Sequence, residues 1–277
     1  MNQLRFVRRA LHLGAALALI PLMHAPVVHA ASAEPLRVCA DPDYLPYSNR
    51  AGQGFENKIA QVVGHALGRP VVYVWGSTRG EDGFDQVIHT QLNAGKCDLL
   101  VDVPYSVPSV NTTRPYYISS YVFIYKKSAG YDLTSLDSPV LHHVKIGYEA
   151  DTPAAEGLKL RALTIGAKPF LTADQEDASP SDIIAAIESG TINVGISWDP
   201  AVATYVAKHP DLTTVILPNS RSQETPEQYS FPMSMATREN DKALGDQLNT
   251  IIVTHRAALA QVLHDYNIRF FEPGDST

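Results

Sequence analysis

The stretch that most constrains the fold runs from Leu92 to Lys126, because it combines a helix end with two strands that no helix separates. Gly95 follows the apolar helical face that ends at Leu92, and glycine readily takes the left-handed conformation that ends helices. Cys97 to Val103 is a short, mostly apolar run, the pattern of a strand covered on both faces in an α/β sheet. Tyr121 to Tyr125 also favours a strand. With no helix to bring it back beside its neighbour, we expect this strand to leave one sheet for another.

Helix and strand patterns alternate on both sides of this stretch. A strand from Leu36, a helix from Phe55 to Leu67, a strand from Val71 to Trp75 and a second helix precede it. This β-α-β-α-β order predicts a parallel sheet, because crossover connections are right-handed. A second alternation runs from Val144 to Leu217, and a second crossing segment from Ser230 to Ala236 leads to a long helical pattern, Asp241 to Tyr266, that we expect to cover the first sheet.

These patterns predict an α/β fold of two lobes, each a mostly parallel sheet flanked by helices, joined by two crossing hinge strands. The predicted limits are 31–122 together with 232–277 for lobe 1, and 123–231 for lobe 2. Hinged lobes of this kind close around ligands.

The chain begins with the pattern of a secretory signal peptide. Arg5, Arg8 and Arg9 precede an apolar run that is too short to span a bilayer, and small residues follow it. We expect residues 1–30 to be removed near Ala30 or Ala33, leaving an exported periplasmic protein that does not span a membrane. Loss of the three arginines changes the formal net charge from −7 to −10. An acidic protein is a poor partner for nucleic acid.

Cys39 and Cys97 are the two cysteines of the chain, and a pair is expected to bond in an oxidising compartment. If Asp41 and Asp102 share the carboxyl edge of the sheet, however, the cysteines are offset by about three residues, roughly 10 Å along parallel strands. That separation is too large for an unstrained bridge. A disulfide, slightly favoured, and two buried thiols are therefore both open.

Aromatic and acidic side chains fall at predicted strand ends that face the cleft between the lobes. Such a set suits a flat, neutral or cationic ligand, or a protein segment. Arg114 favours packing against Tyr116 or Tyr117, and Thr152 heads a helix start able to hold an anion. Asp199 is equally a helix cap or a contact to a ligand's ammonium group. The candidate cleft residues are Asp41, Tyr44, Tyr47, Asp102, Tyr105, Arg114, Tyr148, Thr152, Trp198 and Asp199.

Signals for catalysis and for metal binding are weak. The chain contains neither G-x-S-x-G nor H-E-x-x-H, and its histidines are scattered. We therefore expect no catalytic residues, no metal and no cofactor. Asp41 and Asp102 could form a carboxylate pair for acid-base chemistry, which makes a hydrolase or dehydratase the third and least favoured hypothesis.

Four dispersed blocks carry a resemblance to a known family: Arg37 to Pro42, Gly54 to Ala60, Leu92 to Asp98 and Thr112 to Tyr117. The mature chain resembles the type II periplasmic solute-binding fold. Within that fold it is similar to the MxaJ/XoxJ-type proteins associated with pyrroloquinoline-quinone (PQQ) methanol dehydrogenases. It departs from them at Gly76 to Gly83, a segment with two acidic residues where the family is more basic.

The resemblance implies a non-catalytic periplasmic accessory protein that binds a quinoprotein methanol or alcohol dehydrogenase, with the cytochrome c of that enzyme as a further partner. Amino-acid receptors of this fold usually hold the α-carboxylate with an arginine after the third strand. The matching loop, Tyr105 to Val110, has none. The second hypothesis is the solute-binding component of an ABC importer for a small polar or cationic molecule.

Overall fold

The structure is a computed structural model that describes residues 34–80, 83–171, 175, 177–220 and 227–274. The predicted signal peptide and both cleavage sites lie outside these residues. Among the helices within them, none combines the length and the apolar character that a membrane span requires.

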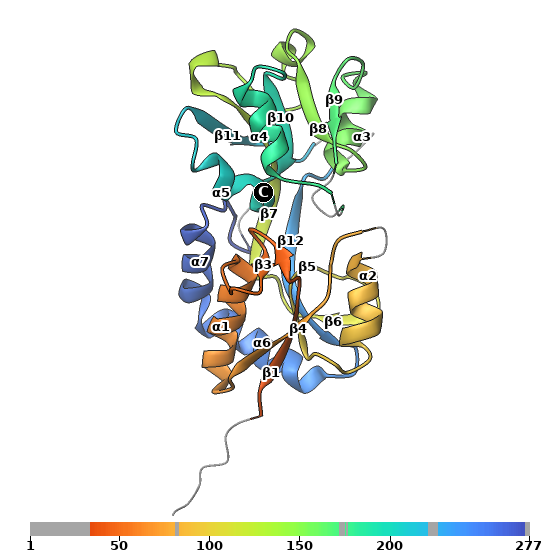
Figure 1. The fold of residues 1–277 in the computed structure, drawn as a ribbon, viewed down its shortest axis with the longest axis vertical. Helices are drawn as coiled ribbons and strands as arrows, with labels where there is room; N and C mark the ends of the chain where they lie inside the picture. Colours follow the sequence, from red (N-terminus) through yellow and green to blue (C-terminus); the bar gives the residue numbers. More distant parts are fainter. Residues whose placement is uncertain (1–33, 81–82, 172–174, 176, 221–226, 275–277) are drawn as a thin grey trace, which may run out of the picture. The chain divides into compact units, whose positions relative to one another are not determined.

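Strands and helices alternate along the chain as the sequence pattern predicts (Figure 1). The strands are β1 (Leu36–Ala40), β2 (Asp43–Tyr44), β3 (Ser48–Asn49), β4 (Val71–Trp75), β5 (Leu99–Pro104), β6 (Val110–Thr112), β7 (Tyr117–Lys126), β8 (Ile146–Glu149), β9 (Lys168–Phe170), β10 (Val194–Trp198), β11 (Leu212–Ile216) and β12 (Ser230–Arg238). The helices are α1 (Phe55–Leu67), α2 (Gly83–Val87), α3 (Pro153–Leu160), α4 (Ser181–Glu188), α5 (Asp199–Val206), α6 (Lys242–Thr254) and α7 (Arg256–Asp265). Short helical turns η1 (Ile88–Leu92), η2 (Lys127–Ala129) and η3 (Pro139–His142) complete the set.

The first lobe is built on a sheet in which β1 lies between β4 and β5, with both pairs parallel. β12 joins β5 as an antiparallel neighbour. Because side chains alternate along a strand, Leu36 and Val38 of β1 face the core formed with α1, α6 and α7, whereas Cys39 faces the one formed with α2 and η1. The predicted parallel β-α-β-α-β unit and the return of the C-terminal helical segment to it are confirmed. That segment is two helices, because the chain leaves the helical conformation at His255 (φ −115°, ψ 20°).

The second lobe repeats this plan. β8 lies between β9 and β10 with both pairs parallel, and β10 and β11 flank β7 as antiparallel neighbours. Helix α3 packs on one face of the sheet, and α4 and α5 pack on the other. The predicted second alternation is therefore present.

β7 passes from the first sheet to the second. Its residues 117–120 pair with residues 230–233 of β12, and residues 121–126 pair with β10 and β11 (Figure 1). The two crossing segments thus run side by side, and the predicted two-lobed fold class is confirmed. The limits at 122/123 and 231/232 stay predictions.

A disulfide joins Cys39 to Cys97, whose Cα atoms are 5.5 Å apart. The expected offset of about 10 Å was wrong because β5 begins at Leu99, so that Cys97 precedes the strand. Gly95 takes the predicted left-handed conformation (φ 73°), and the Cys97 amide donates to the Gln91 carbonyl. This turn carries Cys97 over the sheet face that holds Cys39.

Candidate functional site

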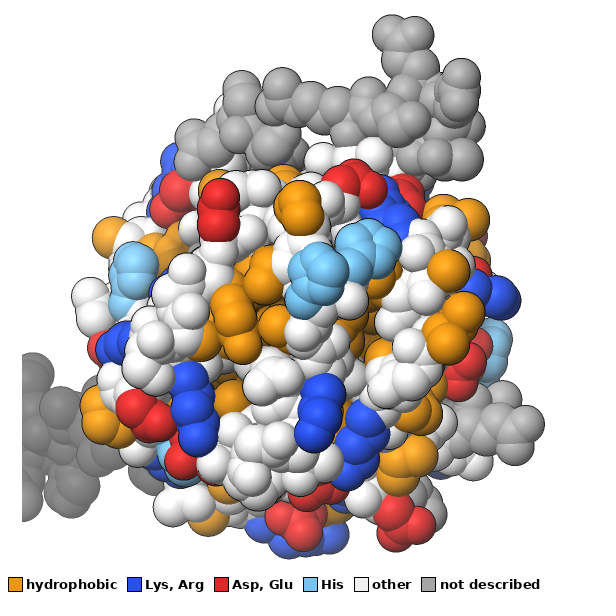
Figure 2. All heavy atoms as spheres, turned by 90° about the horizontal axis from the view of Figure 1, so that it is seen from above, with side chains coloured by type: hydrophobic (Ala, Val, Ile, Leu, Met, Phe, Trp, Pro, Cys, Tyr) orange, Lys and Arg blue, Asp and Glu red, His pale blue; other side chains and the backbone are white. Residues whose placement is uncertain are grey.

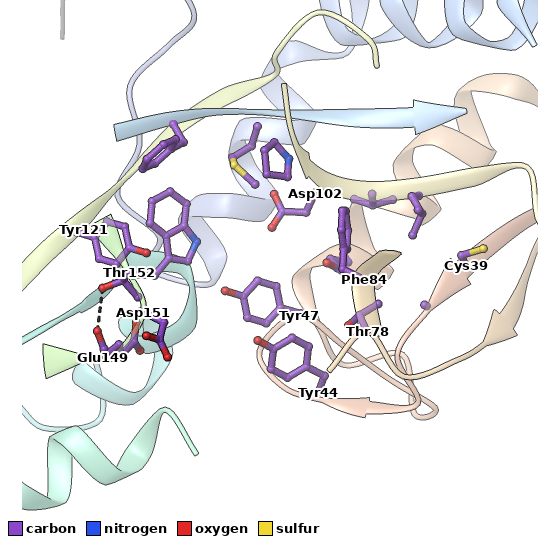
Figure 3. Close-up of a pocket in the computed structure, with 18 residues that line it drawn as sticks. Cys39, Tyr44, Tyr47, Thr78, Phe84, Asp102, Tyr121, Glu149, Asp151 and Thr152 are labelled. Carbon is purple, nitrogen blue, oxygen red and sulfur yellow. Dashed lines mark hydrogen bonds between the residues drawn. The ribbon is translucent and has the colours of Figure 1, made fainter. Parts of the chain in front are cut away.

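A cavity of about 440 Å³ lies between the lobes, a size usual for small-molecule sites. One wall comes from the β2–β3 hairpin and the first turn of α1, and the other from the ends of β8 and β10; β5, β7 and β12 lie between them. The side chains that line it are mostly aromatic or acidic (Figure 3). The aromatic ones are Tyr44, Tyr47, Phe84, Tyr121, Trp198 and Phe231, and the acidic ones are Glu56, Asp102, Glu149 and Asp151.

The aromatic rings form a group on each wall. Tyr44 and Tyr47 stack with ring centroids 4.6 Å apart on the first lobe. On the other side, Trp198 packs edge-on to Tyr121 at 5.3 Å. Figure 3 shows Tyr44 and Tyr47 facing Tyr121, Glu149 and Asp151 across the cavity. A ligand that enters would therefore meet ring faces from both lobes.

Gly54 explains why the wall formed by Tyr47 and Glu56 takes this shape. Helix α1 begins directly after Gly54, and the Glu56 amide donates to the Tyr47 carbonyl at 3.0 Å. Asn57 Oδ1 accepts from the Gly54 and Asn49 amides, both at 3.1 Å, which ties the helix start to the hairpin. A Cβ on Gly54 would stand 1.9 Å from the Tyr47 carbonyl oxygen. The close approach of helix and hairpin therefore requires glycine.

We expect Gly54→Ala to lower the free energy of unfolding by about 3 kcal/mol, since the clash is with backbone and the core must shift. Gly54 itself has φ −83°, which alanine tolerates, so the cost is steric. Gly68→Ala is the matched control, because Gly68 has open space around its Cβ position but φ 65°. It will cost about 1 kcal/mol. Urea denaturation measures both, and equal losses would contradict the steric argument.

Asp102 lies at the middle of the cavity wall, on β5, with a left-handed backbone (φ 61°). Its Oδ1 accepts hydrogen bonds from the phenol of Tyr117 and, at 3.5 Å, from that of Tyr116. Burial raises the pKa of Asp102 to about 7, although both tyrosine hydrogen bonds act in the opposite direction. Asp102 therefore exchanges its proton near neutral pH.

Glu56 and Glu149 are acidic cavity residues that the sequence analysis missed. Burial raises the pKa of Glu56 well above its usual range; the negative charge of Asp102 adds to this, and a hydrogen bond from Ser48 opposes it. Glu149 is 6% exposed, and its Oε1 accepts from Ser197 Oγ at 2.6 Å. The end of the strand at Tyr148 was a usable signal for Glu149, because the next residue on a strand points to the opposite side.

Five of the ten candidate residues line the cavity: Tyr44, Tyr47, Asp102, Thr152 and Trp198. Thr152 also caps α3, since its Oγ1 accepts from the Ala155 amide at 3.2 Å and donates to the Glu149 carbonyl at 2.8 Å. Thr152 therefore caps the helix, as one would expect of its position, and also lines the cavity. The other five candidates do not line the cavity. They are Asp41, Tyr105, Arg114, Tyr148 and Asp199.

Asp41 is buried beside the cavity but does not line it. Its Oδ1 accepts from the Asp43 amide at 2.8 Å, and its Oδ2 accepts from the Thr78 amide at 2.9 Å. The carboxylate thus ties two loops to the end of β1. Asp102 lines the cavity and Asp41 does not, so the two carboxyl groups do not share the cavity lining.

Asp199 neither caps α5 nor reaches the cavity. Trp198 occupies the N-cap position, and Asp199 Oδ2 accepts from the backbone amide of Arg269 at 2.7 Å, which ties down the C-terminal tail. Burial raises the pKa of Asp199 to about 7, against the effect of this hydrogen bond and the Arg269 charge. Both predicted roles of Asp199 were wrong, because its carboxylate accepts a hydrogen bond from the backbone of Arg269, which is 70 positions away in the sequence.

The remaining three candidate residues also lie outside the cavity lining. Arg114 is exposed, with its amide bound to Asn249 Oδ1 at 2.7 Å, and among the described residues it makes no cation–π contact. Its predicted packing on a tyrosine was wrong, since Tyr116 and Tyr117 turn inward toward Asp102. Tyr148 packs on the core of the second lobe. Tyr105 is 50% exposed beside the cavity-lining Pro104.

The described residues supply no lysine, arginine or histidine to the cavity lining. Arg79 is close, with its guanidinium 5.3 Å from the Tyr44 ring centroid and its Nε 3.7 Å from Asp41 Oδ2, but it does not line the cavity. A carboxylate ligand would therefore find, among the described lining residues, no guanidinium of the kind that binds it in amino-acid receptors.

Known proteins resemble this chain over most of its length. No family model matches the chain. Protein MoxJ of Methylorubrum extorquens is 27% identical over 250 residues, which cover 84% of this chain and 80% of MoxJ. An uncharacterised protein of Paracoccus denitrificans, from the cycB 3' region, is 46% identical over 71 residues, 25% of this chain and 84% of the relative.

Two solved structures share the fold over most of the chain. The MxaJ structure from Methlophaga aminisulfidivorans is 25% identical, with a TM-score of 0.77, and the alignment covers 85% of this chain and all of MxaJ. The structure of periplasmic binding protein XoxJ from Methylobacterium extorquens is 28% identical, with a TM-score of 0.66 and coverage of 85% and 99%. Because these proteins match the chain in both lobes and across the connections between them, the chain resembles the MxaJ/XoxJ-type proteins and has the type II periplasmic solute-binding fold.

Proposed function

We propose that this protein is exported to the periplasm and serves there as a non-catalytic accessory protein of a PQQ-dependent methanol or alcohol dehydrogenase, which it binds. The MxaJ/XoxJ-type resemblance implies that partner. The observation that favours an accessory role over an ordinary amino-acid receptor is the lining of the cavity, in which the described residues place four carboxyl groups and no basic side chain. Such a lining offers no guanidinium to hold the α-carboxylate that amino-acid receptors bind.

The partner contact, we infer, lies on the cleft side of the first lobe. Tyr105 is half exposed at the end of β5, and exposed aromatic residues often dominate the binding energy of protein interfaces. The surface at the outer end of the second lobe is less suited to recognise one particular partner. Figure 2 shows basic and acidic side chains interspersed there around exposed hydrophobic groups, with no single sign of charge covering the face.

The proposal predicts that the immobilised protein captures the purified dehydrogenase, and that Tyr105→Ser weakens the capture at least tenfold, roughly the effect of losing one aromatic anchor. Ile165→Ser is the matched control, because Ile165 is a large hydrophobic residue, 84% exposed, that follows α3 on the other lobe. Surface plasmon resonance with apo and holo dehydrogenase measures both variants.

Capture unaffected by Tyr105→Ser but lost with Ile165→Ser would move the contact to the second lobe. A metabolite that raises the melting temperature strongly, together with no captured dehydrogenase in either form, would contradict the accessory role itself.

A further inference from the structure

A separate groove of about 650 Å³ shares no lining residue with the cavity described above. Helix α5 and strand β11 form one wall, and the end of α7 with the tail that follows it forms the other (Figure 1). Three large apolar residues of the lining, Val206, Ile216 and Phe270, are only partly buried. The groove therefore offers apolar surface to a partner.

The free edge of β11 runs along this groove. Among the described strands, β11 pairs with β7 alone. The Leu217 amide donates to the Tyr121 carbonyl at 2.9 Å, so the odd-numbered residues of this antiparallel pair exchange hydrogen bonds with β7. Because the direction of these bonds alternates along a strand, Thr214 and Ile216 point their backbone groups away from β7. The Thr214 carbonyl accordingly accepts from Arg269 Nη1 at 2.7 Å.

Two backbone amides of this edge have no acceptor in the described part of the chain. They belong to Thr214 and Ile216, which donate to none of the described backbone carbonyls or side chains. Thr214 is only 7% exposed. Buried amides are nearly always paired, and the unpaired groups of an edge strand are a template for another extended chain. The edge can therefore accept an added strand.

The permanent positive charges of the groove have spare hydrogen-bond donors. Lys127 and Arg269 line it, and both are exposed. Lys127 Nζ donates to the Pro210 carbonyl at 2.7 Å, and Arg269 uses only Nη1 of its guanidinium, for the Thr214 carbonyl. Neither cation forms a salt bridge with a described residue. Each can therefore bind a carboxylate that comes from outside.

Acidic groups near the groove do not cancel these charges. Asp199 is the one carboxylate that the described residues place in the lining; it is 2% exposed and accepts from the Arg269 amide. The Arg269 charge also favours its ionised form. At the other end, Glu188 lies 3.6 Å from His209 and does not line the groove. The accessible lining is therefore positive, whereas the whole chain has a net charge of −7.

We propose that this groove docks an acidic, extended segment of a partner protein, which adds a strand to the free edge of β11. Carbonyl groups of the segment accept from the amides of Thr214 and Ile216. Its carboxylates bind Lys127 and Arg269, and its apolar side chains pack on the apolar lining. A second copy of β11 would instead bring the cations of both copies together, which is unfavourable. The proposal does not depend on dehydrogenase binding, because Tyr105 does not line the groove.

Fluorescence anisotropy with the peptides EVEVE, QVQVQ and KVKVK, capped at both ends, tests the charge preference. Side chains at alternate positions of an extended chain share one face, about 7 Å apart, so EVEVE presents its carboxylates together. We expect it to bind about tenfold more tightly than QVQVQ, as for two partly exposed ion pairs, and KVKVK to bind most weakly. Equal affinities, or no binding of EVEVE at millimolar concentration, would overturn the proposal.

The double variant Lys127→Gln with Arg269→Gln will weaken EVEVE binding about tenfold and leave QVQVQ binding unchanged. Lys96→Gln with Lys242→Gln is the matched control, because it removes the same charge from exposed positions outside the groove. Circular dichroism verifies the fold of both double variants. An equal loss of EVEVE binding in the control would show that only net charge matters.

Hydrogen exchange followed by NMR tests the added strand by itself. Saturating EVEVE will slow exchange of the Thr214 and Ile216 amides about tenfold, whereas the Val215 amide, which faces β7, will keep its rate. Protection of β4, the free edge of the first sheet, in place of β11 would contradict the site. Sedimentation provides a further check: a dimer that EVEVE dissociates would identify a second copy as the occupant and overturn the assignment to a partner.

Discussion

Replacement of both Cys39 and Cys97 by alanine will lower the free energy of unfolding by about 4 kcal/mol, since the disulfide joins residues 58 positions apart and the loss of a loop of that length restores much unfolded-state entropy. Both sulfur atoms lie in the buried core between the first sheet and α2. Urea denaturation under oxidising conditions measures the change. The wild-type protein unfolded with a reductant present is the control, because it keeps the sulfur atoms but loses the bond. A double variant as stable as the oxidised wild type would show that the bond does not form in the native protein.

Asp102→Asn will remove a large part of the pH dependence of stability. The pKa of Asp102 is about 7 in the folded protein and about 3.9 in an unfolded chain. Between these values the folded state binds more protons than the unfolded state, so this group contributes its full stability below about pH 4 and loses it as pH rises through 7. A difference of three pKa units corresponds to a loss on the order of 4 kcal/mol by pH 8. Asparagine does not titrate, and its amide oxygen still accepts from Tyr117.

Urea denaturation of both proteins from pH 4 to pH 8 measures this effect. The wild type will lose stability toward pH 8 relative to the variant. Asp98 provides a control of opposite sign: burial alone would raise its pKa, but hydrogen bonds from Arg37 and Arg238 outweigh burial and lower it. Asp98→Asn will therefore reduce stability at neutral pH, and this loss will disappear in acid. Parallel pH profiles for wild type and Asp102→Asn would contradict the raised pKa.

The fold was largely predictable because its signals are local. Gly68 and Gly95 take the left-handed conformation that ends their helices, at φ 65° and 73°. Thr152 with the following proline marks the start of α3. The crossing strand was recognisable because no helix precedes it. Each of these features depends on a few neighbouring residues, so the sequence shows it directly.

The candidate site was half predictable. Tyr44, Tyr47, Asp102, Thr152 and Trp198 line the cavity because strand ends and helix starts of this fold face the cleft. Glu56 was missed although it belongs to a recognised block, since its position in the first turn of α1 does not reveal that the hairpin turns it toward Asp102.

By itself, the sequence determined the order of strands and helices, the two lobes, the crossing strands and the relationship to MxaJ/XoxJ-type proteins. Only the tertiary structure decided which carboxyl groups share the cavity and whether the cysteines meet. The carboxylate of Asp41 accepts hydrogen bonds from the backbone amides of two loops, and that of Asp199 accepts one from the C-terminal tail. A turn brings Cys97 to Cys39. The physical reason is that periodicity specifies which face of an element is buried, whereas the direction of a single side chain depends on partners distant in sequence and on individual backbone angles.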